Sequence, residues 1–388
     1  MDFDFQWLLL GLPVAFAFGW LASRLDLRQW TREQRETPAA YFKGLNLLLN
    51  EQQDKAIDAF IEAVQHDPNT ADLHFALGNL FRRRGEYERA VRVHLHLLNR
   101  ADLPAAERDR AQHGLAQDYM KAGLFDRAEE AWKALEGSAF DTEARLALLT
   151  LHERSRDWRA AVDDAARLDR SSSTGSYASR IAHYWCEIAL EADAKGQSAD
   201  SADALRKARE AAPQAARPLV IAGQRARAAG NHEQALECWR LLLTSHPNAF
   251  ALVAREHAAS ALAVGGAVQE QVLEELHALY QRVPSLDLLA ATAVLEPELQ
   301  AQRNNVAEHL RAHPSLSAAR ELLRLRVAQR GAADDPEVQN IEAAIARASK
   351  PLQRFRCAAC GFEAEHYFWQ CPGCLNWDSY PTQRLEDL

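Results

Sequence analysis

Four of the six cysteines of this 388-residue chain lie within one short stretch near its end. They form two Cys-x2-Cys pairs, Cys357 with Cys360 and Cys371 with Cys374, and ten residues separate the pairs. Two such pairs can direct four sulfur atoms at one point, and thiolates in a tetrahedral arrangement bind zinc or iron. Gly361 after the first pair permits a turn whose amides donate to the thiolates. We therefore predict that these four cysteines hold one iron or zinc ion.

Disulfides, a redox pair and a nucleic-acid-binding zinc ribbon are the alternatives for these thiols. Disulfides require an oxidising compartment, whereas the N-terminal sequence predicts a cytoplasmic location, as argued below. A thioredoxin-like pair requires a βαβ unit, which is absent from the pattern. The tail after Pro351 is too short to fold without help, so metal binding would supply much of its folding free energy. Residues 351–388 carry three arginines against five acidic side chains, which disfavours nucleic acid.

The beginning of the chain has the composition of a membrane span. Residues 5–22 hold no charged side chain, and as a helix they would extend roughly 27 Å, close to the roughly 30 Å of a bilayer core. A cleaved signal peptide or a buried core helix is the alternative, but signal peptides begin with basic residues and this chain begins with Asp2 and Asp4. We expect a retained membrane anchor over residues 1–23 and a juxtamembrane linker over residues 24–36.

The orientation of this anchor follows from the positions of the basic side chains. No basic residue precedes the span, and four arginines follow it: Arg24, Arg28, Arg32 and Arg35. Basic residues flank the cytoplasmic end of membrane helices. The sequence thus predicts a single-pass protein with a cytoplasmic remainder and an N-terminus on the opposite side of the membrane, which for an inner-membrane protein is the periplasm.

Helical repeats with a period near 34 residues follow the anchor. Gly44 and Ala56 recur one period later as Gly78 and Ala90, with the spacing of the tetratricopeptide repeat. Small residues at these positions let the two helices of a unit approach closely, and stacked units bury the apolar faces that one unit alone would expose. Six units are recognisable up to about residue 250, and two or three degenerate units follow.

Breaks in the helical pattern mark the expected loops. Residues 170–177 and 330–337 are polar or glycine-containing stretches, which we expect to be loops. Pro284 and Pro314 stand where helices are expected to end.

The composition indicates a binding protein rather than an enzyme. A net charge of -9 disfavours nucleic acid as the main partner, and we find no phosphate loop, dinucleotide fingerprint, HExxH motif or nucleophile elbow. Stacked helix pairs curve into a superhelix whose concave face holds a peptide or a helix of a partner. We expect the remaining cysteines, several histidines and the repeat tryptophans to serve packing: Cys186, Cys238, His94, His96, Trp132, Trp158, Trp185 and Trp239.

The combination of anchor, repeats and the tail "CAACGF…WQCPGC" resembles the lipopolysaccharide assembly protein B family of Gram-negative bacteria over essentially the whole length. Further stretches that carry the resemblance lie at residues 47–60, 77–86, 118–129 and 181–190. The resemblance implies an inner-membrane adapter that helps a membrane AAA+ protease degrade the deacetylase committing precursors to lipid A. It also implies contacts with other lipopolysaccharide assembly proteins, and it leaves a homodimer open.

The resemblance further implies a rubredoxin-like tail in which Cys357, Cys360, Cys371 and Cys374 hold the metal. Two features depart from rubredoxin: Leu375 stands where glycine usually follows the last cysteine, and the loop between the pairs is far shorter. Both weaken the expectation of electron transfer.

These observations predict one architecture: an all-α tetratricopeptide-repeat superhelix with an N-terminal transmembrane helix and a small C-terminal rubredoxin-like domain. The expected boundaries are 1–23 for the anchor, 24–36 for the linker, 37–350 for the array and 351–388 for the metal-binding domain.

Overall fold

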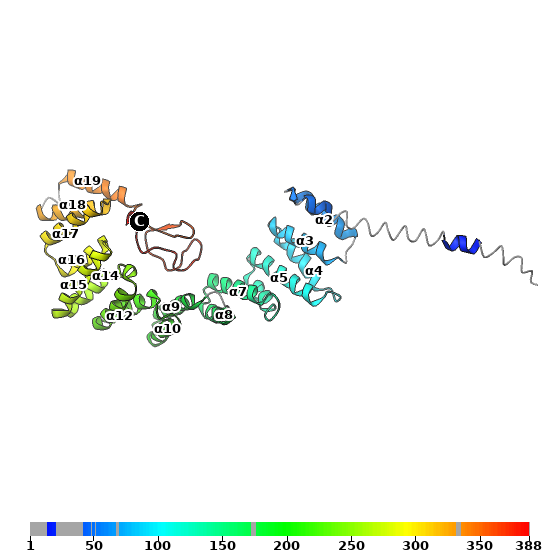
Figure 1. Ribbon diagram of the computed structural model, residues 1–388, viewed down its shortest axis with the longest axis horizontal. Helices are drawn as coiled ribbons and strands as arrows, with labels where there is room; N and C mark the ends of the chain where they lie inside the picture. Colours follow the sequence, from blue (N-terminus) through cyan, green and yellow to red (C-terminus); the bar gives the residue numbers. More distant parts are fainter. Residues whose placement is uncertain are drawn as a thin grey trace, which may run out of the picture. The chain divides into compact units, whose positions relative to one another are not determined.

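The computed structural model describes residues 14–20, 42–47, 49–50, 52–66, 70–171, 176–330 and 335–387. Helices dominate the described residues, and a small β-hairpin lies in the C-terminal tail. The chain divides into two compact units, residues 1–160 and 161–388. Figure 1 labels many of the helices of both units along the chain.

Unit 1 consists of consecutive helices, each packed against the next. Their bounds are α2 (Gln53–His66), α3 (Ala71–Arg83), α4 (Tyr87–Leu98), α5 (Ala105–Ala122), α6 (Phe125–Lys133) and α7 (Asp141–Ser155). The start of α4 follows that of α2 by 34 residues (87 minus 53), and the start of α5 follows that of α3 by 34 (105 minus 71). The predicted period is therefore confirmed in the helix boundaries.

Glycine positions in the repeats explain how the helices of a unit approach each other. A Cβ atom added at Gly44 would lie 2.8 Å from the ring of Phe60, and one added at Gly78 would lie 2.6 Å from the ring of His94. Both distances are far below van der Waals contact, so any side chain here would push the neighbouring helix away. Ala56 and Phe60, both on α2, are fully buried.

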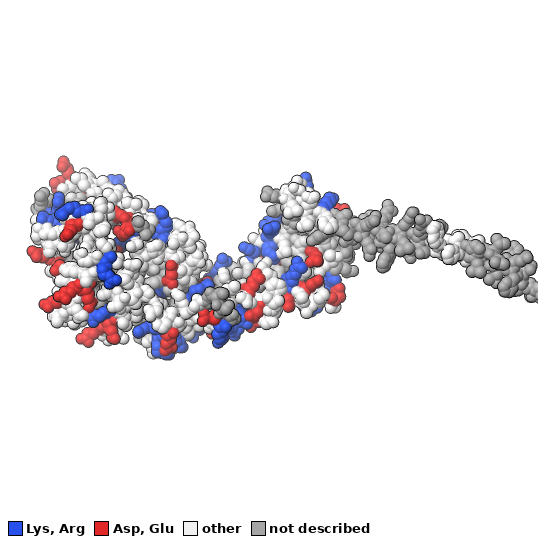
Figure 2. All heavy atoms as spheres, viewed as in Figure 1, with Lys and Arg blue, Asp and Glu red and all other residues white. Residues whose placement is uncertain are grey.

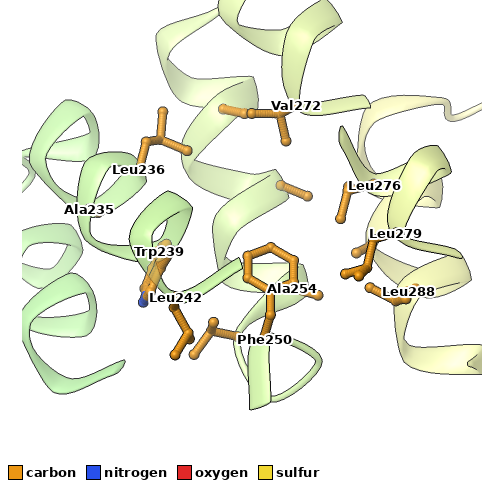
Figure 3. Close-up of a cluster of buried hydrophobic side chains, with 14 of the residues drawn as sticks. Ala235, Leu236, Trp239, Leu242, Phe250, Ala254, Val272, Leu276, Leu279 and Leu288 are labelled. Atoms are coloured by element: carbon orange, nitrogen blue, oxygen red, sulfur yellow. The ribbon is translucent and has the colours of Figure 1, made fainter. Parts of the chain in front are cut away.

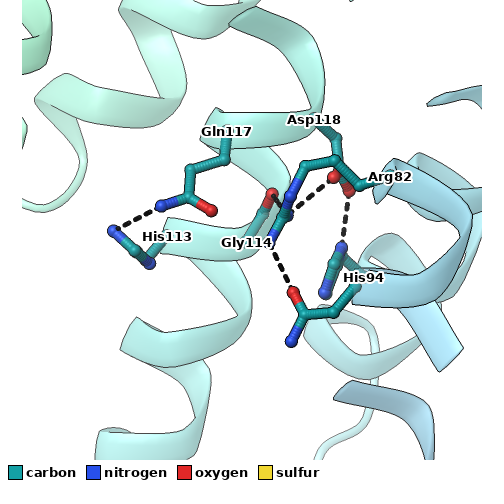
Figure 4. Close-up of polar contacts among 7 residues, drawn as sticks. Arg82, His94, His113, Gly114, Gln117 and Asp118 are labelled. Atoms are coloured by element: carbon teal, nitrogen blue, oxygen red, sulfur yellow. Dashed lines mark hydrogen bonds and ion pairs between the residues drawn. The ribbon is translucent and has the colours of Figure 1, made fainter. Parts of the chain in front are cut away.

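A buried polar network joins α3, α4 and α5 in unit 1 (Figure 4). Asp118 accepts one hydrogen bond from Arg82 at 2.8 Å and pairs with His94 Nδ1 at 2.6 Å. Arg82 also donates to the carbonyl oxygen of Gly114. Because the Asp118 carboxylate is fully buried and partnered on both oxygens, its burial is compensated. His94 is thus buried in the helix packing, as predicted, and it also pairs with Asp118.

Unit 2 continues the succession of helices from α8 (Trp158–Ser171), which begins just before the unit boundary. The bounds of the others are α9 (Ala178–Ala194), α10 (Ser198–Ala211), α11 (Ala216–Ala228), α12 (His232–Ser245), α13 (Pro247–Phe250), α14 (Ala254–Val264), α15 (Gly266–Arg282), α16 (Leu286–Leu295), α17 (Leu299–Ala312), α18 (Leu316–Arg330) and α19 (Pro336–Ser349). Helix α15 ends before Pro284 and helix α17 before Pro314, as predicted.

The largest core of unit 2 lies among α11, α12, α14, α15 and α16 (Figure 3). Trp239 and Phe250 are fully buried there beside Leu276 and Leu288. The indole of Trp239 packs directly on Gly223 of the preceding helix, which has no side chain to obstruct it. The predicted packing role of Trp239 is confirmed, and the helical stacking continues beyond residue 250.

The C-terminal tail adds a small β-structure to the helices. Strands β1 (Phe355–Arg356) and β2 (Glu363–Ala364) pair antiparallel, with Phe355 opposite Ala364. A short 3-10 helix, η1 (Leu385–Asp387), closes the chain. Over the ranges that the structure describes, all regular secondary structure before this tail is helical.

The predicted membrane span at residues 5–22 lies largely outside the described residues, and the predicted linker at residues 24–36 lies entirely outside them. Residues 14–20 are helical. Within the described ranges, no helix combines the length and the apolar character that crossing a membrane requires.

Candidate metal centre

The tail brings the four predicted cysteines together. Their sulfur atoms all lie within 4.8 Å of one another. Cys357 Sγ lies 3.8 Å from Cys374 Sγ, and Cys360 Sγ lies 3.6 Å from Cys371 Sγ. Four sulfurs at roughly 2.3 Å from a tetrahedral metal would be roughly 3.8 Å apart. The sulfur positions therefore fit a zinc or iron ion. Among the described residues, no other group of histidine, cysteine or acidic side chains has this arrangement.

Both Cys-x2-Cys pairs have the same backbone geometry. In the first, the Cys357 amide donates to Phe362 O and the Gly361 amide donates to Cys357 O, both at 2.9 Å. In the second, the Cys371 amide donates to Asn376 O at 2.9 Å and the Leu375 amide to Cys371 O at 2.8 Å. The donors and acceptors therefore stand at equivalent positions, so the two pairs form a matched set of knuckles.

The residue after each knuckle adopts a left-handed backbone conformation. Gly361 has a φ of 77° and Leu375 a φ of 61°. Glycine adopts this region without cost, whereas a leucine side chain there is strained. Leu375 therefore occupies the position that Gly361 fills in the first knuckle, and the second knuckle keeps the same backbone hydrogen bonds despite the leucine.

The close packing of the sulfur atoms shifts the pKa values of two of the thiols in opposite directions. Burial opposes ionisation of Cys357, but hydrogen bonds with Ser379 and with the amides of Cys360 and Ala359 lower its pKa to about 6. The Phe362 amide lowers the pKa of Cys360, yet desolvation and the neighbouring sulfurs outweigh it and raise that pKa to about 12. Several thiolates so close together repel each other, and a metal ion removes that repulsion.

The second knuckle docks on helix α9 of the array. Asp378 Oδ2 accepts hydrogen bonds from His183 Nε2 at 2.8 Å and from Ser179 Oγ at 3.2 Å. The ring of Trp377 stacks on His183, with 4.6 Å between centroids. Arg217 of α11 also lies over the Trp377 ring, with its guanidinium carbon 5.5 Å from the ring centroid. These contacts join the cysteine cluster to two helices.

A further set of contacts holds the end of the tail to α16 and α18. Arg384 forms an ion pair with Asp287 at 2.9 Å, and Glu386 accepts from the amide of Ser317 at 3.0 Å. Gln353, at the start of the tail, donates to Ser317 Oγ. The tail is thus attached to the helices on both sides of the cysteine cluster.

Sequence reasoning missed the docking residues. The sequence analysis gives no role to His183, and Asp378 enters it only in the charge count of the tail. The available signal is the spacing of Ser179, His183 and Glu187, which places three polar side chains on one face of α9. Glu187 binds Arg217 at 2.6 Å and so orients the guanidinium toward the tail.

The cysteines outside the tail do not join the cluster. Burial raises the pKa of the Cys186 thiol to about 12, against a smaller opposing effect of Arg217. Cys238 is half-buried, and burial raises its pKa as well. Both thiols are therefore poor nucleophiles and metal ligands, in agreement with the predicted packing role.

Helix pairs at a 34-residue period, together with a docked four-cysteine knuckle, define a helical-repeat protein with a candidate metal-binding tail. A family model described as a rubredoxin metal binding domain matches residues 355–380. Lipopolysaccharide assembly protein B of Escherichia coli strain K12 is 30% identical over 395 residues, which cover 98% of this chain and 99% of that protein. The Haemophilus influenzae protein of the same name is 25% identical and covers 96% of both chains. The chain belongs to the lipopolysaccharide assembly protein B family.

Solved structures with some likeness to this chain include tetratricopeptide-repeat proteins. A repeat protein from Parabacteroides merdae is 13% identical, covers 67% of this chain and 98% of its own, and has a TM-score of 0.33. PilF of Pseudomonas aeruginosa is 14% identical, covers 63% of this chain and 99% of its own, and has a TM-score of 0.31.

Proposed function

We propose that the chain is a non-enzymatic adapter that regulates lipopolysaccharide synthesis. It would present the deacetylase that commits precursors to lipid A to a membrane AAA+ protease, and it would organise other lipopolysaccharide assembly proteins. Family membership over nearly the whole length supports the pathway. The observation that carries the adapter role is the docked tail, because a small domain fixed onto repeat helices extends their surface for binding partners.

We also propose that Cys357, Cys360, Cys371 and Cys374 hold one iron or zinc ion. The sulfur separations and the matched knuckles support this assignment. When bound, the metal would supply the folding free energy that the short tail lacks. Trp377 and Asp378, which lie shortly after the second knuckle, would then attach the folded tail to α9.

The proposed location is the inner membrane. Residues 1–23 would anchor the chain, residues 24–36 would connect the anchor, and residues 37–350 and 351–388 would form the cytoplasmic array and its metal-binding domain. The uncharged stretch and the arginines after it support this topology. Anchoring would raise the effective concentration of membrane partners by confining them to one plane.

The test of the adapter role is the half-life of the deacetylase after depletion of this chain. Degradation by a protease that depends on an adapter slows when the adapter is removed, so we expect a longer half-life. An unchanged half-life with altered lipopolysaccharide assembly would instead favour a purely structural scaffold. Restoring the chain from a plasmid controls for indirect effects of depletion.

A redox protein is the second candidate, because the family model that matches the tail describes a rubredoxin domain. Aerobic purification distinguishes it from the adapter. A red protein that bleaches reversibly with reductant would support an iron centre that cycles between two states. A colourless protein containing zinc would exclude electron transfer at this site, since zinc has no accessible second oxidation state.

A further inference from the structure

Helices α17 and α18 enclose a cavity of about 370 Å³ that the proposed function does not use. Three arginines line it: Arg303 and Arg311 of α17 and Arg326 of α18. Two amides, Asn304 and Gln329, complete its polar lining, and no acidic side chain belongs to it. In Figure 2, a group of basic side chains lies over this part of unit 2.

The sequence places these side chains on the facing surfaces of the two helices. On α17, Arg303, Ala307 and Arg311 are spaced by four residues and so share one helix face. On α18, Leu322, Arg326 and Gln329 follow at intervals of four and three, which also defines one face. Ala307 and Leu322 leave room for the longer arginines to reach the same cavity.

No carboxylate compensates the charge of this cavity among the described residues, unlike the charge of two other arginines of α18. Arg320 of α18 pairs with Glu342 of α19, and Arg324 pairs with Glu321 on the preceding turn of α18. Arg311 and Arg326, in contrast, have no ion pair among the described residues. The guanidinium groups that line the cavity therefore give it a net positive charge in a protein whose net charge is -9.

Hydrogen bonds fix one of the three guanidinium groups in place. Arg303 Nη1 donates to Gln329 Oε1 at 3.0 Å, and Gln329 Nε2 donates to Gln300 Oε1 at 3.0 Å. Arg303 is half-buried, whereas Arg311 and Arg326 are exposed at the mouth of the cavity. The site therefore has one positioned donor and two donors that can move onto a ligand.

We propose that this cavity, here called the α17–α18 arginine pocket, binds a phosphate-bearing anion. A guanidinium group offers two parallel N–H donors that match phosphate oxygens. A phosphate ester carries close to two negative charges near neutral pH and three strong acceptor oxygens. It can satisfy three arginines at once, whereas a single carboxylate has one charge and two oxygens. The phosphate can come from a soluble compound or from a lipid headgroup.

Calorimetric titration of the full-length chain with sodium pyrophosphate tests the proposal. We expect saturable binding at near-physiological ionic strength, where attraction beyond about 8 Å is screened. Arg311→Gln with Arg326→Gln should weaken it roughly tenfold or more, because two charge-assisted contacts are lost. Arg311→Lys keeps the charge and loses the paired donors, so its effect should be smaller. Arg282→Gln removes an exposed arginine of α15 and should leave binding unchanged.

Co-flotation with vesicles identifies the source of the phosphate. If vesicles containing phosphatidic acid bind the chain, vesicles of phosphatidylcholine do not, and pyrophosphate competes, a lipid headgroup occupies the pocket. If pyrophosphate binds and the vesicles do not, the ligand is soluble. If neither binds, or if the double variant binds as well as the original chain, the proposal is wrong. Binding of a glutamate-rich peptide alone would also overturn it, in favour of an acidic protein partner.

Discussion

At the scale of single residues, the knuckles show where the sequence tolerates strain. Leu375 holds a left-handed conformation at the position that glycine fills in the first knuckle. A side chain in this region costs roughly 1–2 kcal/mol. The strain is local, because the hydrogen bonds of the second knuckle match those of the first.

Leu375→Gly should stabilise the metal-loaded tail by up to about 1 kcal/mol. The substitution removes the backbone strain, and the greater freedom of glycine in the unfolded chain offsets part of the gain. Chelator competition for the bound metal reports the change as tighter retention. Gly361→Ala is the matched control and should weaken retention of the metal. Gly361 has a φ of 77°, and any residue with a side chain is strained in this conformation. Weaker retention in Leu375→Gly would show that the leucine side chain contributes more by packing.

His257 predicts how the stability of unit 2 depends on pH. The ring is fully buried, packs edge-on to Phe250, and has no hydrogen-bond partner among the described residues. Burial, helped by Arg240, lowers the pKa of His257 from 6.5 to about 4. The neutral ring is thus favoured in the folded state, so its contribution is fully present above pH 6.5 and is lost progressively as the pH falls toward 4.

The expected loss of unfolding free energy from His257 between pH 6.5 and pH 4 is about 3 kcal/mol, at about 1.4 kcal/mol for each pKa unit. Urea unfolding of the original chain and of His257→Leu at both pH values measures it. The variant has no titrating ring, so the difference between the two proteins should change by this amount. An equal pH dependence in both would contradict the buried neutral histidine.

At the scale of elements, the repeats were predictable and the docking of the tail was not. The period near 34 residues and the small residues Gly44 and Gly78 follow local rules of helix packing, and the structure confirms them. The bond between His183 and Asp378 joins residues 195 positions apart, and no local pattern encodes such a pair. The helices beyond residue 250 were recognised by their periodicity, although their repeat pattern is degenerate there.

Asp378→Ala should release the tail from α9 while the cysteine cluster stays loaded. The change removes the acceptor of two hydrogen bonds, from His183 and Ser179, and leaves the buried His183 ring without that partner. We expect a loss of about 1–2 kcal/mol in docking, because half of the Asp378 side chain is exposed to water. Faster hydrogen exchange in α9 with unchanged metal content is the expected result. Glu308→Ala, an exposed acidic residue of α17, serves as the control. Unaltered exchange in α9 would show that Trp377 and Arg384 suffice to hold the tail.

Cys371→Ser should release the metal and unfold the tail, since Cys371 is fully buried at the centre of the cluster. The repeat helices have their own cores and should remain folded. Elemental analysis measures the bound metal, and far-ultraviolet circular dichroism measures the helices. Metal content equal to that of the original chain would contradict the four-thiolate site.

At the scale of the whole molecule, we propose an adapter with three parts: a membrane anchor, a repeat array and a C-terminal tail whose fold a bound metal ion stabilises. The anchor rests on the sequence, the array and the docked tail on the described helices, and the pathway on family membership. In the proposed adapter, the tail would contribute to regulation because it is held at several points of unit 2, where its loss would change the surface offered to partners.

The most direct measurement of this claim is the half-life of the lipid A-committing deacetylase in cells that carry the original chain, Cys371→Ser or Cys238→Ser. Cys238 lies outside the sulfur cluster, so its substitution controls for the loss of a thiol. The account predicts a prolonged half-life with Cys371→Ser and a normal one with Cys238→Ser. A normal half-life with Cys371→Ser, in cells where the metal is shown to be lost, would contradict the claim that the stapled tail is part of the adapter.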